Sequence, residues 1–370
     1  MKKYLAFLLS LLLIVTTFVL SGCSGTRNTV EHLEGEYSTA LAGTELNVFN
    51  WGEYISDGSE GMLDVNAAFE KLTGIKVNYS NYDSNETMYS KLKSGASSYD
   101  IIIPSDYMIQ RLISENMLST LDTSSLSNYK YIAPQYKNLY YDPENKYSVP
   151  YNVGMVGLIY NTKTVKKAPE SWDIMWDKQY KDQILTFNNS RDAFAIAQFL
   201  IGVDINSENK ADWDKAAKKL KEQTPLLQGR VMDEVFNKME SGNAAIAPYY
   251  AGDFLTMKSN NPDLEFVYPK EGTNIFVDSV CIPKNCQNYE AAMLYINFLL
   301  EPEVALENAE YLCYASPNTE VINNDDYSFK GNPILYPAKE QVENAEYFHD
   351  LDSDVRSHYE KLWESVIASK

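Results

Sequence analysis

Aromatic residues stand beside acids, amides or hydroxyls at six points of this 370-residue sequence, mostly in loops that follow predicted strands. A cation that lies over an aromatic face gains about 0.5–2 kcal/mol. A charge-assisted hydrogen bond adds about 1.5–3 kcal/mol. Aromatic walls with nearby carboxylates therefore suit a ligand that carries ammonium groups on an alkyl chain. The six segments are 50–54, 104–107, 187–194, 247–253, 275–279 and 312–318.

The same residues also have a purely structural explanation. An aromatic residue at the end of a strand can belong to the core or to its rim. Asp192 stands at the start of a helix predicted over 193–200, where an aspartate often caps the first turn. Composition alone therefore leaves both explanations open.

Strands alternate with helices through the first part of the chain. Alternating or continuous apolar residues predict strands at 46–49, 75–79 and 100–104, and helical spacing predicts helices at 62–72 and 86–93. This β-α-β-α-β order predicts a mainly parallel, doubly wound sheet. Ligands of such sheets bind at the carboxyl ends of the strands, where the first aromatic and acidic segments are found.

A second series of strands and helices begins at 154–160. Two β/α series in one chain predict an α/β protein with two lobes. The later elements are predicted as helices at 210–222, 231–241, 288–300, 303–312 and 352–369, and a strand at 264–268.

The N-terminus has the pattern of a secreted protein. Lys2 and Lys3 precede an apolar run over 4–20, and Cys23 follows a Leu-Ser-Gly sequence. The run is near the lower limit for a membrane span, which is the alternative interpretation. The Leu-Ser-Gly-Cys sequence resembles the bacterial lipobox, in which the cysteine is lipidated. We therefore expect a lipoprotein signal peptide at 1–22, a lipid on Cys23 and a flexible tether at 23–43, outside the cytoplasm or in the periplasm.

The chain is strongly acidic, with a net charge of −19. Removal of 1–22 takes away two lysines and no acid, which brings the charge to −21. Such a surface repels nucleic acid and anionic lipid. It serves solubility, attracts a cationic ligand, or does both.

Metal and cofactor sites are not expected. Three cysteines remain beyond Cys23, and their spacing matches no metal template; Cys281 and Cys286 could instead pair across a short loop, or be buried thiols. The chain also lacks the G-x-S-x-G, P-loop, H-E-x-x-H and G-x-G-x-x-G motifs. We therefore expect a binding protein rather than an enzyme, with an amine-modifying enzyme as the alternative.

Five short segments, in this order, resemble the periplasmic spermidine/putrescine-binding proteins of ABC transporters. They are NWGEY at 50–54, YDSNETMYSKL at 82–92, YSVPY at 147–151, YPKEG at 268–272 and INFLL at 296–300. The resemblance extends from about residue 44 to the C-terminus.

The resemblance implies a two-lobe, hinged α/β fold of the type II periplasmic-binding-protein kind. Lobe one would be 44–154 with 278–322, and lobe two 155–277 with 323–370. A monomer would capture putrescine and/or spermidine in the cleft between the lobes and deliver it to a membrane permease.

The resemblance also assigns residues to the ligand. Glu53, Asp192 and Asp278 would bind ammonium groups. Asn189 replaces an acid of the best-known member, Tyr249 and Phe276 replace tryptophans, and Phe348 replaces a glutamine, so the preferred polyamine stays open. The implied ligand-binding residues are Trp51, Glu53, Tyr54, Ser105, Tyr107, Asn189, Asp192, Tyr249, Phe276, Asp278 and Tyr314.

A ferric-iron-binding protein of the same architecture is the other binding function to consider. Adjacent Tyr249 and Tyr250 resemble the phenolate pair that such proteins use, and carboxylates are nearby in the sequence. The remaining resemblance favours amines over iron.

Overall fold

The structure is a computed structural model, and it describes residues 30–95 and 97–369. The predicted signal peptide, Cys23 and residues 24–29 of the predicted tether lie outside this part of the chain. None of the helices within it is both long and apolar enough to cross a membrane.

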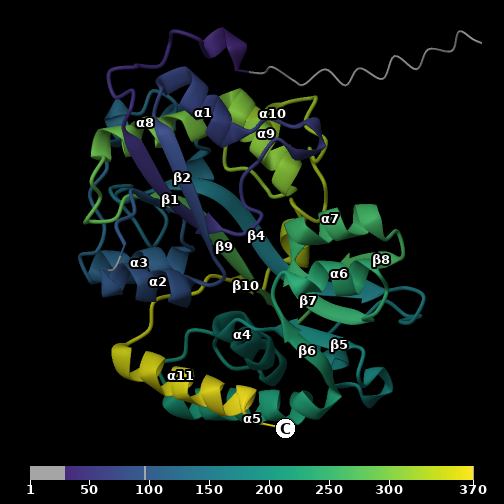
Figure 1. Cartoon of the computed structure of the whole chain (residues 1–370). Helices are drawn as coiled ribbons and strands as arrows, with labels where there is room; N and C mark the ends of the chain where they lie inside the picture. The colour runs from purple at the N-terminus through teal and green to yellow at the C-terminus, as the bar shows by residue number, and fades with distance from the viewer. Residues whose placement is uncertain (1–29, 96, 370) are drawn as a thin grey trace, which may run out of the picture.

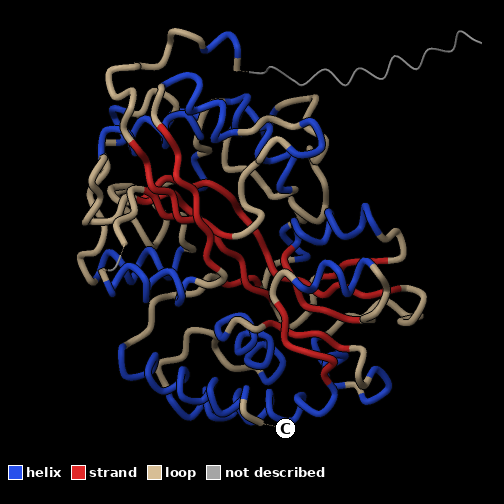
Figure 2. The backbone as a smooth tube through the Cα atoms, viewed as in Figure 1, coloured by secondary structure: helices blue, strands red, loops and turns tan. Residues whose placement is uncertain are grey.

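A ten-stranded sheet, counted over the described residues, runs diagonally through the molecule with helices on its outside (Figure 2). The strands follow the order β2-β1-β3-β9-β4-β7-β5-β6, while β8 pairs with β4 and β10 with β9. Their bounds are β1 Glu45–Trp51, β2 Lys76–Tyr82, β3 Ile101–Ile102, β4 Ser148–Asn161, β5 Ile184–Phe187, β6 Leu227–Val231, β7 Ile246–Tyr250, β8 Leu264–Val267, β9 Thr273–Cys281 and β10 Ala345–Glu346.

The sheet is mixed, whereas the sequence predicted a mainly parallel one. Strand β1 is parallel to β2 and β3, and β5 is parallel to β6 and β7, as each β/α series predicts. The long strands β4 and β9 are antiparallel to each other, because the chain passes between the lobes in opposite directions along them. Two of the predicted lobe boundaries, after residue 154 and before residue 278, fall within these two strands.

Helices cover both lobes (Figure 1). The upper lobe carries α1, α8, α9 and α10, and the lower lobe carries α4 to α7 and α11. The predicted helices are present, with ends that differ by up to three residues. Their bounds are α1 Val65–Thr73, α2 Asn85–Ser94, α3 Asp106–Ser114, α4 Ser190–Ile201, α5 Lys210–Gln223, α6 Glu234–Glu240, α7 Ala251–Asn260, α8 Tyr289–Leu299, α9 Pro302–Leu312, α10 Thr319–Asn323 and α11 Ser353–Ile367.

Aromatic side chains pack against one another inside each lobe. In the first lobe, Phe69 of α1 lies edge-on against Tyr295 of α8, with 5.0 Å between the ring centroids. In the second, Trp213 of α5 stacks on Tyr359 of α11 at 4.8 Å. The final segment contacts both lobes, because Tyr327 packs with residues of α9 and α10 before the chain reaches α11. A further cluster of buried side chains contains residues of both lobes, so packing as well as the long strands joins them.

Residues 30–43 pack on the first lobe, although the sequence predicted a flexible tether there. Val30, Leu33 and Tyr37 are buried in the first-lobe core. The Tyr37 hydroxyl donates to Glu301 Oε1 at 2.6 Å. Three well-spaced apolar side chains are enough to hold a short segment that has no helical or strand period of its own.

Candidate ligand-binding pocket

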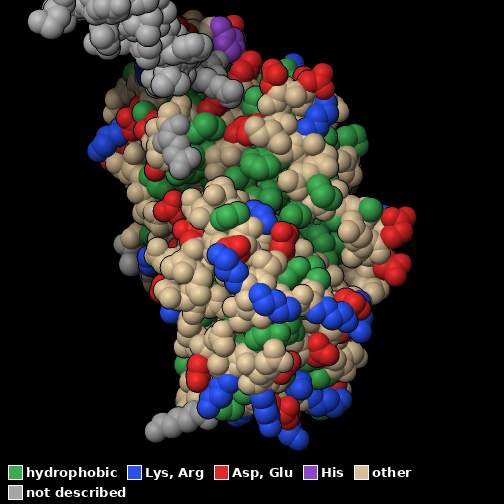
Figure 3. Space-filling view, turned by 90° about the vertical axis from the view of Figure 1, so that its right-hand side faces the viewer, with side chains coloured by type: hydrophobic (Ala, Val, Ile, Leu, Met, Phe, Trp, Pro, Cys, Tyr) green, Lys and Arg blue, Asp and Glu red, His purple; other side chains and the backbone are tan. Residues whose placement is uncertain are grey.

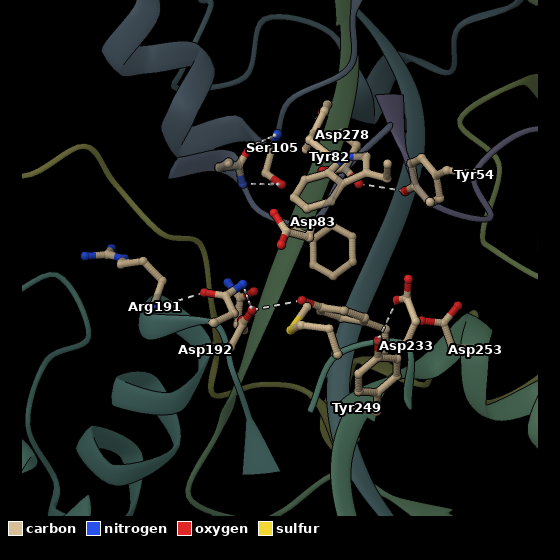
Figure 4. Close-up of a pocket in the computed structure, with 18 of the residues that line it drawn as sticks. Tyr54, Tyr82, Asp83, Ser105, Arg191, Asp192, Asp233, Tyr249, Asp253 and Asp278 are labelled. Atoms are coloured by element: carbon tan, nitrogen blue, oxygen red, sulfur yellow. Dashed lines mark hydrogen bonds between the residues drawn. The ribbon is translucent and has the colours of Figure 1, made fainter. Parts of the chain in front are cut away.

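The structure brings all eleven predicted ligand residues into the lining of one pocket between the lobes (Figure 4). They come from segments up to 263 residues apart: the ends of β1 and β7, the starts of α3 and α4, strand β9, and the segment that follows α9. Phe348, from the segment before α11, lines it as well.

Asp278 of β9 is the most deeply buried acid that the sequence predicted, with 4% of its surface exposed. Its Oδ2 accepts a hydrogen bond from the Tyr54 hydroxyl at 2.6 Å. Its Oδ1 is buried and has no partner among the described residues. Burial raises the pKa of Asp278 to about 6, while the nearby hydroxyl groups of Ser105 and Tyr54 oppose the rise. This carboxylate is placed to receive a cation.

Asp192 lies in the first turn of α4, and its Oδ2 is held from two sides. The Tyr250 hydroxyl donates to it at 2.9 Å and the Asn189 amide nitrogen at 2.8 Å. Asn189 is the N-cap of α4, because its own Oδ1 accepts from the Arg191 backbone nitrogen at 3.0 Å. Burial raises the pKa of Asp192 to about 7. Asp192 is therefore part of the pocket, and the capping role that it could have had falls to Asn189.

Two acids of the second lobe line the pocket although the sequence did not single them out. Asp253, in the first turn of α7, accepts from the Tyr314 hydroxyl at 3.2 Å, and burial raises its pKa to about 8. Asp233, just before α6, accepts from the Tyr249 hydroxyl at 3.5 Å, and burial raises its pKa too. Asp253 closes the segment 247–253, whose composition could have pointed to it. Asp233 stands in no such segment.

Aromatic side chains form the walls between these acids. Trp51 at the end of β1 lies 4.6 Å from Tyr82, measured between ring centroids, and Phe276 lies edge-on to Tyr250 at 5.5 Å. The rings leave apolar surface between the carboxylates, where methylene groups of a ligand would be desolvated favourably.

The two ends of the pocket differ in exposure. We define the mouth by Glu53, Asp83 and Asp233, which are exposed. The inner end is defined by its buried residues, which are 2–7% exposed: Asn189, Arg191, Asp192 and Phe348. Seven acids line the pocket and Arg191 is its one basic residue among those described, so the cavity is strongly acidic overall.

The predicted hydroxyl and aromatic residues of the first lobe are held by one amide. Asn85 donates to Ser105 Oγ at 3.1 Å and to the Tyr107 hydroxyl at 3.2 Å. Tyr107 in turn donates to Glu86 Oε1 at 3.0 Å. Asp106 beside them is fully buried and accepts from the Val277 backbone nitrogen at 3.1 Å, so it fixes β9 against α3.

No group of three or more His, Cys, Asp or Glu side chains in the described residues is arranged to hold a metal ion. Cys281, Cys286 and Cys313 are free thiols, so the pairing that the sequence left open between the first two is absent.

A sequence model of the bacterial extracellular solute-binding proteins matches residues 65–336, most of the described chain. This protein belongs to that family. The membership accounts for two α/β lobes with a pocket between them, and it assigns the protein to the solute-binding components of transporters and to a place outside the cytoplasm.

The relatives of this solute-binding protein confirm the resemblance that the five segments predicted. It is 33% identical over 329 residues to the spermidine/putrescine-binding periplasmic protein of Escherichia coli strain K12, which covers 88% of this chain and 92% of the relative. It is 29% identical over 312 residues to the putrescine-binding periplasmic protein PotF of the same strain, over 79% of this chain and 83% of the relative.

Solved structures agree with the two-lobe α/β fold. A structure from Listeria monocytogenes described as a spermidine/putrescine ABC transporter superposes with a TM-score of 0.84 at 36% identity, over 88% of this chain and all of the other. A substrate-binding protein PotD from Streptococcus pneumoniae superposes with a TM-score of 0.72 at 34% identity, over 88% of this chain and 98% of that one.

Proposed function

We propose that this protein captures a polyamine, putrescine and/or spermidine, in its pocket and delivers it to the permease of an ABC transporter. The observation that carries the proposal is the unpartnered Oδ1 of Asp278. A buried carboxylate oxygen without a donor is costly, and an ammonium group would supply both charge and hydrogen bonds. The names of the relatives support the same class of ligand.

In this proposal the acids bind the ammonium groups and the rings enclose the methylenes. Asp278 and Asp192 bind one end of the ligand, while Glu53 and Asp253 lie toward the other. The eleven residues predicted from the sequence contact the ligand together with Asp253. An affinity near micromolar, about −8 kcal/mol, needs only two or three such contacts once the costs of desolvation and ordering are met.

We further propose how the protein works in its compartment. The lobes, 44–154 with 278–322 and 155–277 with 323–370, close on the ligand because contacts with both lobes form only in the closed state. A monomer, held by more than one acyl chain on Cys23, then docks on the permease; a single chain binds membranes only weakly.

Two other functions are less well supported. Ferric iron would need phenolates at Tyr249 and Tyr250, but burial raises the pKa of both phenols well above its usual value. A visible charge-transfer band on addition of ferric iron would favour this function. Catalysis on the amine would appear as loss of its primary amino groups during incubation, whereas we expect full recovery of the ligand.

Calorimetric titration of residues 24–370 with putrescine, cadaverine, spermidine and spermine tests the proposal. We expect at least one of them to bind and Asp278→Asn to weaken it about 10- to 100-fold, because a charge-assisted bond is lost. Asp325→Asn is the matched control, since its side chain is 99% exposed and lies outside the pocket. Absence of heat with all four amines, or full affinity in Asp278→Asn, would contradict the proposal.

A further inference from the structure

Arg191 is a buried cation at the inner end of a pocket that is otherwise lined by acids. It follows the N-cap of α4 and is 2% exposed. Its side chain extends from α4 behind Asp192, away from the centre of the pocket (Figure 4). A buried charge is costly unless its surroundings compensate it. The contacts of this guanidinium therefore indicate which kind of group its position can bind.

The guanidinium lies in surroundings that would equally suit a ligand ammonium. Its Nη2 donates to Asn206 Oδ1 at 3.0 Å and to the His349 carbonyl at 3.2 Å, and both acceptors are neutral. Its central carbon lies 4.5 Å from the ring centroid of Phe348 and 5.5 Å from that of Tyr107. Neutral oxygens and aromatic faces are the contacts by which proteins bind organic cations.

Two further features show that the surroundings of Arg191 leave a hydrogen bond unmade and space unfilled. Arg191 Nε is buried and has no hydrogen-bond partner among the described residues. Arg191 also lines a second, smaller cavity behind the pocket, together with Glu86 and Asp350. The guanidinium therefore lies between the ligand pocket and a cavity that is lined by these two carboxylates and also by Arg111 and Arg356, the second of which pairs with Asp350.

We propose that Arg191 is a tethered cation that fills the innermost cation position and limits the ligand to the amines that fit between Asp192 and the mouth. This inference rests on the proposed polyamine function and adds to it the residue that sets ligand length. A third ammonium cannot pass Asp192, because the guanidinium occupies its place and repels it. Removal of the side chain would free Asn206 Oδ1, the His349 carbonyl and the two aromatic faces for that ammonium.

The test is a calorimetric comparison of putrescine with spermidine on the parent, Arg191→Ala and Arg191→Lys. We expect Arg191→Ala to raise the affinity for spermidine relative to putrescine about tenfold or more. Asp192 contacts both ligands, so a change in its ionisation shifts the affinity for both in the same direction. Arg191→Lys keeps a cation in place and should keep the ratio of the parent.

Arg230→Ala is the matched control. Arg230 belongs to the same lobe, is half-buried and lies 5.3 Å over the Trp363 ring, but it does not line the pocket. Its loss should leave the ratio unchanged. Ethylguanidinium at millimolar concentration should raise the melting temperature of Arg191→Ala more than that of the parent or of Arg230→Ala, because it can refill the vacated position.

The results separate this inference from the proposed function. If the parent binds none of the amines, the proposed function fails. If the parent binds them and Arg191→Ala loses affinity for both equally, Arg191 only supports the fold and the inference is overturned. Should Arg191→Ala not fold, Arg191→Met keeps most of the volume without the charge; an unchanged ratio in that variant would overturn the inference as well.

Discussion

Asp278, Asp192 and Asp253 are carboxyl groups that burial protonates in part near neutral pH, with pKa values raised to about 6, 7 and 8. Removal from water disfavours the charged form of each acid. A polyamine restores that form, since its ammonium groups keep their protons up to about pH 9 to 10. Ligand binding and proton release are therefore coupled at these three residues.

We expect affinity to rise with pH through this window. Below their raised pKa values the three acids hold protons that a cationic ligand must displace, so affinity is lost as pH falls from 8 to 6. The expected change is at least about tenfold. At pH 7, binding should release protons, which appears as different heats of binding in phosphate and Tris buffers. Equal heats in the two buffers would mean that these acids are already ionised in the empty pocket.

At the scale of elements, two glycines let aromatic rings lie against the backbone. A Cβ on Gly154 of β4 would be 2.3 Å from the Phe276 ring, and one on Gly252 of α7 would be 2.4 Å from the Tyr314 ring. Real atoms do not approach so closely, so these positions need glycine because of their neighbours and not because of their φ angles. The absence of a side chain at Gly252 of helix α7 thus lets the Tyr314 ring lie against the helix backbone.

Gly252→Ala should displace the Tyr314 ring and break its hydrogen bond to Asp253. We expect a loss of about 1–3 kcal/mol in the free energy of unfolding and a weaker affinity for polyamines. Chemical denaturation and calorimetry measure the two effects. Gly229→Ala is the control, because a Cβ there would meet nothing within 4 Å; equal losses in both variants would rule out the ring contact as the cause.

At the scale of the molecule, contacts between the lobes at both ends of the pocket indicate that the lobes are close together. A Cβ on Gly52 of the first lobe would lie 3.2 Å from Asp233 Oδ2 of the second. The Asp350 backbone nitrogen, in the segment before α11, donates to Gln110 Oε1 of α3 at 2.8 Å.

The charged side chains are unevenly distributed over the surface. Figure 3 shows lysine and arginine side chains gathered at the lower end of one face, over the second lobe.

The net charge of −19 should accelerate the approach of a cationic ligand. We expect the association rate constant to fall about tenfold between 20 mM and 500 mM NaCl, because salt screens the attraction beyond a few ångströms. The dissociation rate constant should change less, and spermidine should be affected more than putrescine. Stopped-flow measurement of intrinsic fluorescence gives both rates. If the association rate constant does not depend on salt, the negative charge serves solubility and does not attract the ligand.

The sequence by itself predicted the alternation of helices and strands and the six segments that contain the pocket residues. These were accessible because they depend on local properties. The glycines that end α1 and α2, Gly74 and Gly95, have positive φ, 73° and 64°, which is a local preference. Aromatic residues with acids follow strands in a parallel sheet, which is a local pattern too. The order of the five segments gave the resemblance to solute-binding proteins, and the resemblance singled out the eleven residues, which composition could not do.

Only the tertiary structure decided the rest. The antiparallel run of β4 beside β9, the packing of residues 30–43 and the place of Asp233 all depend on partners far away in the sequence. For Asp192 the fold decides between two explanations that the sequence left open, a helix cap and a pocket residue. Burial is a property of the whole molecule: it raises the pKa values of the pocket acids and places the Arg191 guanidinium behind Asp192, and no local spacing encodes either.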